Sequence, residues 1–161
     1  MEHTNILKIL GNIEGCDIVL RPDGVVQYQA KLAVDCDGSD NRHGDPCWQA
    51  DTSLHHDGKP LDAESVPYVV VPPLVLQAVS GIVLGCQAQV TNTVTGKRTK
   101  AVVGDVGPRR KLGEASCECA RRVGLDGNPN RGGTDQHIVL YEIFPGTAAA
   151  VDGVTYTLKH S

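Results

Sequence analysis

Two carboxylates in one short stretch have the types and the spacing that glycoside hydrolysis requires. Asp105 ends an apolar strand pattern, and Glu114, nine positions later, begins a short pattern of helical periodicity. The turn between them contains Gly107, Pro108 and a basic triplet. A rigid strand–turn–helix corner could hold the two carboxyl groups about 6.5–9.5 Å apart, which is the separation that an inverting glycosidase needs. Asp105 and Glu114 are therefore the candidate catalytic pair.

Each of these carboxylates also has a purely structural interpretation. Asp105 could cap the turn that follows it, and Glu114 could interact with the dipole of the expected helix. A helix N-terminus would lower the pKa of Glu114, which favours a base, whereas a general acid needs a raised pKa. Gly104 and Gly107 leave little side-chain bulk beside Asp105, so that a polymer could approach closely.

A second acidic group, Asp35, Asp37 and Asp40, lies about seventy residues earlier in the chain. It could bind a cationic sugar amine, form an Asx turn or hold calcium, although an EF-hand loop needs a glycine at another offset and a distal glutamate. We expect substrate binding here and no metal. Trp48, the only tryptophan, lies in a polar loop, where it could stack on a sugar or plug the edge of the core.

The elements that must position these residues are mostly strands. Segment 25–35 alternates apolar and polar residues over its whole length, which is a strong strand pattern. Alternation also predicts a strand at 86–93, and 98–106 returns from it as a hairpin. An apolar run ended by prolines predicts a strand near 66–72, and further strands are expected at 137–144 and 146–158. Apolar residues at helical spacing predict a helix at 114–123, and a short helical turn is expected at 74–79 after two prolines. The loop 38–64 is rich in Asp, Gly and His, and loops this long are usually functional or mobile. We expect a β-barrel with loop insertions.

Composition limits the possible function classes. The chain has 161 residues, which suggests one domain, and only 4% aromatic residues, so the core must consist mainly of Val, Leu, Ile and Ala. A net charge of −4 argues against a nucleic-acid partner, and the basic residues at 109–111 and 121–122 are expected to be surface charge. No apolar run approaches the roughly 18 residues of a membrane span. A mildly acidic protein suits a cationic substrate.

Six cysteines in a small chain favour disulfides and an oxidising compartment. Cys36 and Cys47 flank a polar loop and are the first expected pair, which would stabilise the fold by about 3 kcal/mol. Cys117-x-Cys119 lacks the second pair that a zinc site requires. Residues 1–10 do not have the layout of a signal peptide. Either the chain stays in the cytosol or a signal has been removed, and we expect a secreted protein.

Five segments resemble, in order, motifs of the fungal-type chitosanases, family 75 of the glycoside hydrolases. They are Tyr28-Gln-Ala-Lys-Leu-Ala-Val-Asp-Cys-Asp-Gly-Ser39, Val66-Pro-Tyr-Val-Val-Val-Pro72, Ala101-Val-Val-Gly-Asp-Val-Gly-Pro108, Leu112-Gly-Glu-Ala-Ser116 and Val139-Leu-Tyr-Glu-Ile-Phe-Pro-Gly146. The resemblance implies that Asp105 of the Gly-Asp-x-Gly-Pro motif and Glu114 of the Gly-Glu-Ala-Ser motif are the essential pair. It also implies endo-hydrolysis of β-1,4-linked glucosamine polymers with inversion.

The stretch around Asp105 also resembles double-psi β-barrels such as expansins, barwin and some lytic transglycosylases. That resemblance implies a mainly β fold, a six-stranded double-psi β-barrel with loop insertions and one or two short helices. In barrel relatives that cleave glucans, the position of Glu114 looks like the acid, and an Asp on the first long strand, Asp35 or Asp37, could be the base. The assignment of acid and base therefore stays open.

The resulting hypothesis is a single catalytic domain over 1–161, with its core at about 25–146, that acts as a secreted, inverting endo-chitosanase. We expect Asp105 and Glu114 to be catalytic and Asp35, Asp37, Asp40 and Trp48 to bind chitosan. We expect no cofactor, no nucleic-acid or membrane partner, and a monomer. Two alternatives are a barrel that cleaves peptidoglycan or glucan, and a non-catalytic carbohydrate-binding barrel. Few aromatic residues are available for a polysaccharide cleft: Trp48 and four tyrosines.

Overall fold

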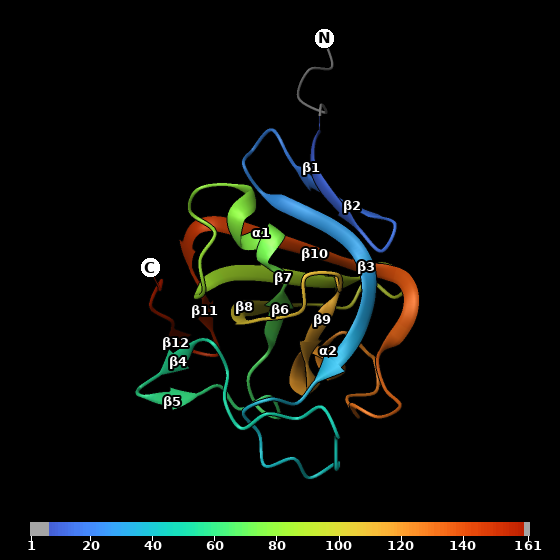
Figure 1. The fold of residues 1–161 in the computed structure, drawn as a ribbon, viewed down its shortest axis with the longest axis vertical. Coiled ribbons are helices and arrows are strands. Elements are labelled where there is room, and N and C mark those ends of the chain that lie inside the picture. Colours follow the sequence, from blue (N-terminus) through green and yellow to red (C-terminus); the bar gives the residue numbers. More distant parts are fainter. Residues whose placement is uncertain (1–6, 160–161) are drawn as a thin grey trace.

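The computed structural model describes residues 7–159 as a mainly β structure with two short helices (Figure 1). The ends of the predicted domain 1–161, and most of the segment considered for a signal peptide, lie outside these residues. The strands of the main sheet are β1 (Lys8–Ile13), β2 (Cys16–Leu20), β3 (Val26–Asp35), β6 (Tyr68–Val71), β7 (Cys86–Asn92), β8 (Arg98–Val106), β9 (Glu114–Ser116) and β10 (Thr134–Ala148). The helices are α1 (Pro73–Ala78) and α2 (Cys117–Arg122), and two small hairpins pair β4 (His55–His56) with β5 (Lys59–Pro60) and β11 (Ala150–Val151) with β12 (Val154–Thr155).

Six strands close a barrel in the order β3-β10-β7-β8-β6-β9, with β9 pairing back to β3. The pairs β3–β9 and β6–β8 are parallel, and the other four pairs in the ring are antiparallel. The predicted mainly β fold, a six-stranded double-psi β-barrel with loop insertions and two short helices, is therefore confirmed. Neither described helix is long and apolar enough to cross a membrane.

Alternation along the strands produces the core. Val26, Tyr28, Ala30 and Leu32 of β3 are buried, as the sequence pattern predicts, and the intervening residues are more exposed. The ring of Tyr28 stacks on that of Tyr141 from β10, with 4.9 Å between the ring centroids. Aliphatic residues fill most of the remaining core, so a low aromatic content is sufficient for this barrel.

An N-terminal hairpin extends the sheet beyond the strands that the sequence predicted. β1 pairs with β2, and β2 pairs antiparallel with the start of β3. Ile13 and Ile18 from this hairpin are buried, as are Val151 and Tyr156 near the C-terminal end. The buried core therefore continues on both sides of 25–146.

The predicted helix from Glu114 to Val123 is wrong at its start. Glu114, Ala115 and Ser116 form the strand β9, which pairs with β3 on one side and β6 on the other, and α2 begins only at Cys117. Ser116 is the N-cap residue, and its hydroxyl accepts a hydrogen bond from the Cys119 N–H. Hydrogen bonding to two strands overrides the helical spacing of the side chains, so Glu114 does not lie at a helix N-terminus.

The predicted Cys36–Cys47 disulfide is also wrong. Cys36 is bonded to Cys117, with 5.8 Å between the two Cα atoms, and Cys47 is an exposed thiol on the loop. The parallel pairing of Asp35 with Ser116 places the residues that follow them, Cys36 and Cys117, beside each other. Proximity in space, across a separation of 81 positions, decides this pairing.

Candidate active site

The two candidate catalytic carboxylates lie on either side of one residue of β6. Val70 pairs with Asp105 on β8 and with Glu114 on β9. Residues that pair directly on neighbouring strands project from the same face of a sheet, so both carboxylates share the face of Val70. Two strand spacings put their Cα atoms about 9–10 Å apart. The barrel thus brings together two residues that the sequence connects only through a turn.

Asp105 is held by a segment of the long loop. The N–H and the hydroxyl of Ser53 donate hydrogen bonds to Asp105 Oδ1 at 3.0 and 2.7 Å, and the Val106 N–H donates to the same oxygen at 3.0 Å. The loop is itself attached to β8, because the Leu54 N–H donates to the carbonyl oxygen of Gly104 at 3.0 Å. The carboxylate, only 8% exposed, is therefore fixed in orientation by Oδ1.

Glu114 lies in a less polar environment. Burial raises its pKa to about 7, the Asp35 carboxylate adds to this increase, and Lys111 and Lys31 oppose it. Gly107 lies directly against it, because a Cβ built on this glycine would come within 3.0 Å of Glu114 Oε1 and 2.9 Å of Val70 Cγ1. The expected lowering of the Glu114 pKa by a helix dipole is therefore contradicted, and the side chain can hold a proton near neutral pH.

Asp35 lies at the end of β3, on the same face as Glu114. Ala33 pairs with Glu114, and Asp35 follows two residues later on the same side of the strand. Its Oδ1 accepts a hydrogen bond from the Asp37 N–H at 2.7 Å, and the hydroxyl of Tyr68 lies 3.5 Å from the same oxygen. Burial, followed by the charges of Asp37 and Asp105, raises the pKa of Asp35.

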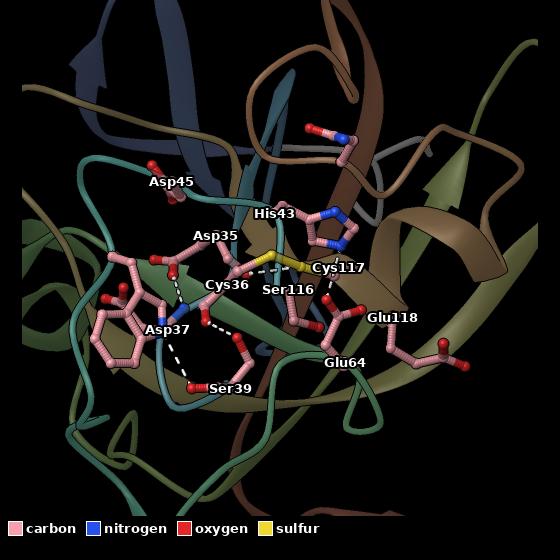
Figure 2. The surroundings of a disulfide bond; sticks show 12 residues. Asp35, Cys36, Asp37, Ser39, His43, Asp45, Glu64, Ser116, Cys117 and Glu118 are labelled. Carbon is pink, nitrogen blue, oxygen red and sulfur yellow. Dashed lines mark hydrogen bonds and ion pairs between the residues drawn. A yellow bond between two sulfur atoms is a disulfide. The ribbon is translucent and has the colours of Figure 1, made fainter. Parts of the chain in front are cut away.

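Asp37 connects this group to the long loop. Its Oδ1 accepts a hydrogen bond from the Gln49 N–H at 2.8 Å, and its backbone carbonyl accepts one from the Tyr68 hydroxyl at 2.9 Å. Figure 2 shows Asp35, Asp37 and Asp45 on one side of the disulfide. Burial is also the largest cause of the raised pKa of Asp37.

All of these carboxylates line one cleft of about 680 Å³, a volume typical of ligand-binding pockets. Its acidic lining residues are Asp35, Asp37, Asp45, Asp51, Asp105 and Glu114, and Lys111 is the only basic one. Asp45 and Asp51 come from the long loop 38–64. The lining is therefore acidic even though burial raises the pKa of Asp35, Asp37 and Glu114, and it suits a cationic ligand.

Two of the residues predicted to bind substrate are not among those lining the cleft. Asp40 forms an ion pair with Arg42 at 3.1 Å, and both side chains are exposed. The indole N–H of Trp48 donates to the Ser39 carbonyl oxygen at 3.1 Å, and its ring packs against the core. Gly104 also differs from expectation, because Leu61 and Tyr68 occupy the space beside it. It serves core packing, whereas Gly107 faces the site.

The disulfide lies directly behind the acidic group. Cys36 follows Asp35, and Cys117 follows β9, so the bond joins the ends of the two strands that carry Asp35 and Glu114 (Figure 2). A carboxylate oxygen of Glu64 lies within 4.8 Å of both sulfur atoms and 2.8 Å from His43 Nε2. With both sulfur atoms oxidised, this group cannot ligate a metal through thiolates.

One set of side chains in the cleft could hold a cation. Oxygen atoms of Asp35, Asp37 and Asp105 all lie within 4.8 Å of one another. Carboxylate oxygens suit hard cations such as calcium. Acidic groups often gather in this way without a metal. Here Asp35 accepts a hydrogen bond from the Asp37 N–H and Asp105 accepts one from the Ser53 hydroxyl, so protein groups already bind one oxygen of each carboxylate.

The sequence did not single out several residues that complete the site. Ser53 orients Asp105, Tyr68 binds the Asp35–Asp37 segment, and Lys111 opposes the charge around Glu114. Only the length and the polarity of the loop 38–64 could have pointed to Ser53. Tyr68 lies in an apolar strand pattern, which ordinarily indicates a core position. Lys111 is the third residue of a basic triplet that was expected to be surface charge.

Comparison with known proteins places this geometry in a family. The family model described as fungal chitosanase of glycosyl hydrolase group 75 matches residues 29–160, which is most of the chain. The match includes the segments that carry Asp35, Asp105 and Glu114. No curated protein matches the chain.

Proposed function

Because this chain belongs to the fungal chitosanases of glycosyl hydrolase group 75, we propose that it is an inverting endo-chitosanase with Asp105 and Glu114 as its catalytic pair. The family implies a glycoside hydrolase that acts on a polysaccharide. The observation that carries the finer proposal is the placement of both carboxylates beside Val70 in an acidic cleft. Their Cα spacing of about 9–10 Å suits the carboxyl separation of about 6.5–9.5 Å in inverting enzymes.

The environments of the two carboxylates support different roles. Burial keeps the pKa of Glu114 near 7, so Glu114 is the proton donor to the glycosidic oxygen. Asp105 has one oxygen held by Ser53, which leaves Oδ2 to accept a proton from the attacking water. The water attacks the anomeric carbon as the bond to the leaving oxygen breaks, which inverts the configuration. This is the arrangement expected of two carboxylates in different surroundings.

The charge of the cleft supports chitosan as the substrate. Glucosamine units carry free amines, and the five aspartates that line the cleft beside one lysine favour the protonated form of these amines. Glucosamine has no N-acetyl carbonyl that could assist the reaction, so the protein must supply both carboxylates. In this proposal Asp35 and Asp37 contact the sugars inside the cleft, and Asp40 and Trp48 contact only sugars that extend beyond it.

The remaining parts of the proposal follow from this assignment. The enzyme works as a monomer and as one catalytic domain, with no cofactor, since the two carboxylates and water are sufficient for hydrolysis. Secretion is consistent with the Cys36–Cys117 disulfide, because such bonds persist in oxidising compartments.

Reducing-end release from soluble chitosan tests the proposal. We expect the wild-type protein to release reducing ends, and Asp105→Asn and Glu114→Gln each to lower kcat by about 10²- to 10⁴-fold. Asp57→Asn is the matched control, because Asp57 is highly exposed in the β4–β5 turn and lies outside the cleft lining. Circular dichroism of each variant shows whether the fold is retained.

Three results would contradict this proposal. Full activity in both variants would remove Asp105 and Glu114 from the mechanism. Release from peptidoglycan or glucan but not from chitosan would change the substrate. Binding to chitosan without any release, unchanged in both variants, would make the protein a carbohydrate-binding barrel.

A further inference from the structure

Asp35 lines the same cleft as the two carboxylates of the proposed mechanism. Glu114 on β9 pairs with Ala33 of β3, and Asp35 lies two residues further along β3 on the same face, diagonally across from Glu114. One oxygen of Asp35 lies within 4.8 Å of an oxygen of Asp105 and of Asp37. The half-buried carboxyl of Asp35 accepts a hydrogen bond from the Asp37 N–H, and the next residue, Cys36, is tied to Cys117 by the disulfide. The role of Asp35 is not explained by the two-carboxylate reaction alone.

We propose that Asp35 is a positioning residue whose carboxylate keeps the proton on Glu114 and so maintains the acid in the form that the reaction needs. This inference rests on the proposed function and deepens it. A negative charge on the neighbouring strand disfavours a second negative charge on Glu114, and the effect is large where both groups are shielded from water. Asp35 in turn interacts with the charges of Asp37 and Asp105, so the protons on this group of carboxyls are not independent.

Charged and titratable groups from each neighbouring element act on Asp35 and Glu114. Those that affect Glu114 are Lys31 and Asp35 from β3, Asp105 from β8 and Lys111 from the loop before β9. Those that act on or contact Asp35 are Asp37 beyond the end of β3, Asp105 from β8 and Tyr68 from β6. Tyr28 is buried below Glu114 and stays neutral, because burial raises its pKa well above the usual value for tyrosine.

Because Asp35 and Lys111 carry opposite charges, removing each should shift the pKa of Glu114 in opposite directions. Asp35→Asn removes a negative charge, so Glu114 should lose its proton at lower pH. Lys111→Met removes a positive charge, so Glu114 should keep its proton to higher pH. Activity requires the protonated acid and falls as pH rises through the pKa of Glu114. The pH at which kcat falls on the alkaline side should therefore be lower in Asp35→Asn and higher in Lys111→Met than in the wild type.

The first experiment measures kcat against pH for the wild type and for these variants. We expect the pH midpoint of the alkaline limb to be lower by about one unit in Asp35→Asn and to be higher than the wild-type value in Lys111→Met. Asp35→Glu should restore the limb toward the wild-type position, and Asp57→Asn should leave it unchanged. A limb that stays in place in Asp35→Asn, although that variant folds and turns over substrate, would overturn the inference.

A second measurement does not depend on activity. Carbon-13 NMR of protein with labelled glutamate carboxyls follows the titration of Glu114, whose signal is identified by its loss in Glu114→Gln. We expect Glu114 to titrate at lower pH in Asp35→Asn than in the wild type. The same midpoint in both proteins would overturn the inference, even if Asp35→Asn were inactive. If the wild type released no reducing ends, the proposed function would fail, and this titration would still test the coupling of the two carboxyls.

Discussion

At the residue scale, the site depends on different surroundings for similar side chains. Asp105 receives three hydrogen bonds on one oxygen, whereas Glu114 lies beside Val70 and Gly107, where burial and the charge of Asp35 raise its pKa. Pairs of titratable groups in unlike environments are typical of acid and base roles. The sequence identified both residues, but a pKa depends on burial and neighbours from other strands, and these are set only by the fold.

Ser53 should affect catalysis through the orientation of Asp105. Ser53→Ala removes the hydroxyl that donates to Asp105 Oδ1 at 2.7 Å but retains the backbone N–H donor. We expect kcat on chitosan to fall by about 10- to 100-fold, because a misplaced base is a poor base, and stability to fall by only about 1 kcal/mol.

Ser65→Ala is the control for this variant, since it removes an exposed hydroxyl that donates at 3.5 Å to the Asp62 carbonyl oxygen and keeps the backbone N–H that donates to the same oxygen at 3.1 Å. Steady-state kinetics and urea unfolding separate the two effects. Wild-type kcat in Ser53→Ala, beside a large loss in Asp105→Asn, would mean that the hydroxyl does not orient the carboxylate.

At the element scale, a strand and a disulfide hold Glu114, the proposed acid, in place. β9 is only three residues long, yet it pairs with both β3 and β6 and so closes the barrel. Ser116 at its end donates to the Val66 carbonyl oxygen at 2.7 Å and accepts from the Tyr68 N–H at 3.0 Å. Cys117 then bonds to Cys36 at the end of β3. These contacts fix the position of Glu114 relative to Asp35.

Loss of the disulfide should weaken both the fold and the site. The bond closes a loop across 81 positions, so Cys36→Ser should lower the free energy of unfolding by about 4 kcal/mol in the chain-entropy model. Cys47→Ser should change little, because Cys47 is an exposed free thiol. Thermal unfolding without and with a reductant measures this effect. A Cys36→Ser variant as stable as the wild type under oxidising conditions would contradict it.

The strands and helices differ in how well the sequence alone predicted them. Alternation predicted β3 and β7 to within a residue or two, because more buried and less buried residues alternate along both strands. The strand β8 was predicted as the hairpin partner of β7, and residues 101–105 of it are all buried. The start of the helix at Glu114 was wrong because pairing with distant strands is invisible to local spacing. The same cause explains the Cys36–Cys47 error and the missing N-terminal hairpin. Motif resemblance identified the catalytic candidates, whereas the contacts that orient them come from the tertiary fold.

At the scale of the whole molecule, charge is distributed in favour of one kind of ligand. The net charge of −4 is modest, but six carboxylates line a single cleft with one lysine. The strands β3, β9, β6 and β8 are consecutive in the barrel and carry Asp35, Glu114 and Asp105 to the same cleft. Such a focused field draws cations and raises their local concentration. The closed barrel therefore brings the proposed acid–base pair and an acidic lining suited to a polymer of amino sugars into one cleft.

The stereochemistry of the first product tests the central claim most directly. Proton NMR during the first minutes of chitosan hydrolysis distinguishes the anomers before they equilibrate. A β-1,4 linkage cleaved with Glu114 as acid and Asp105 as base, with a water between Asp105 and the sugar, should give the α-anomer first. Initial formation of the β-anomer would show retention through a covalent intermediate and would contradict the two-carboxylate inverting mechanism.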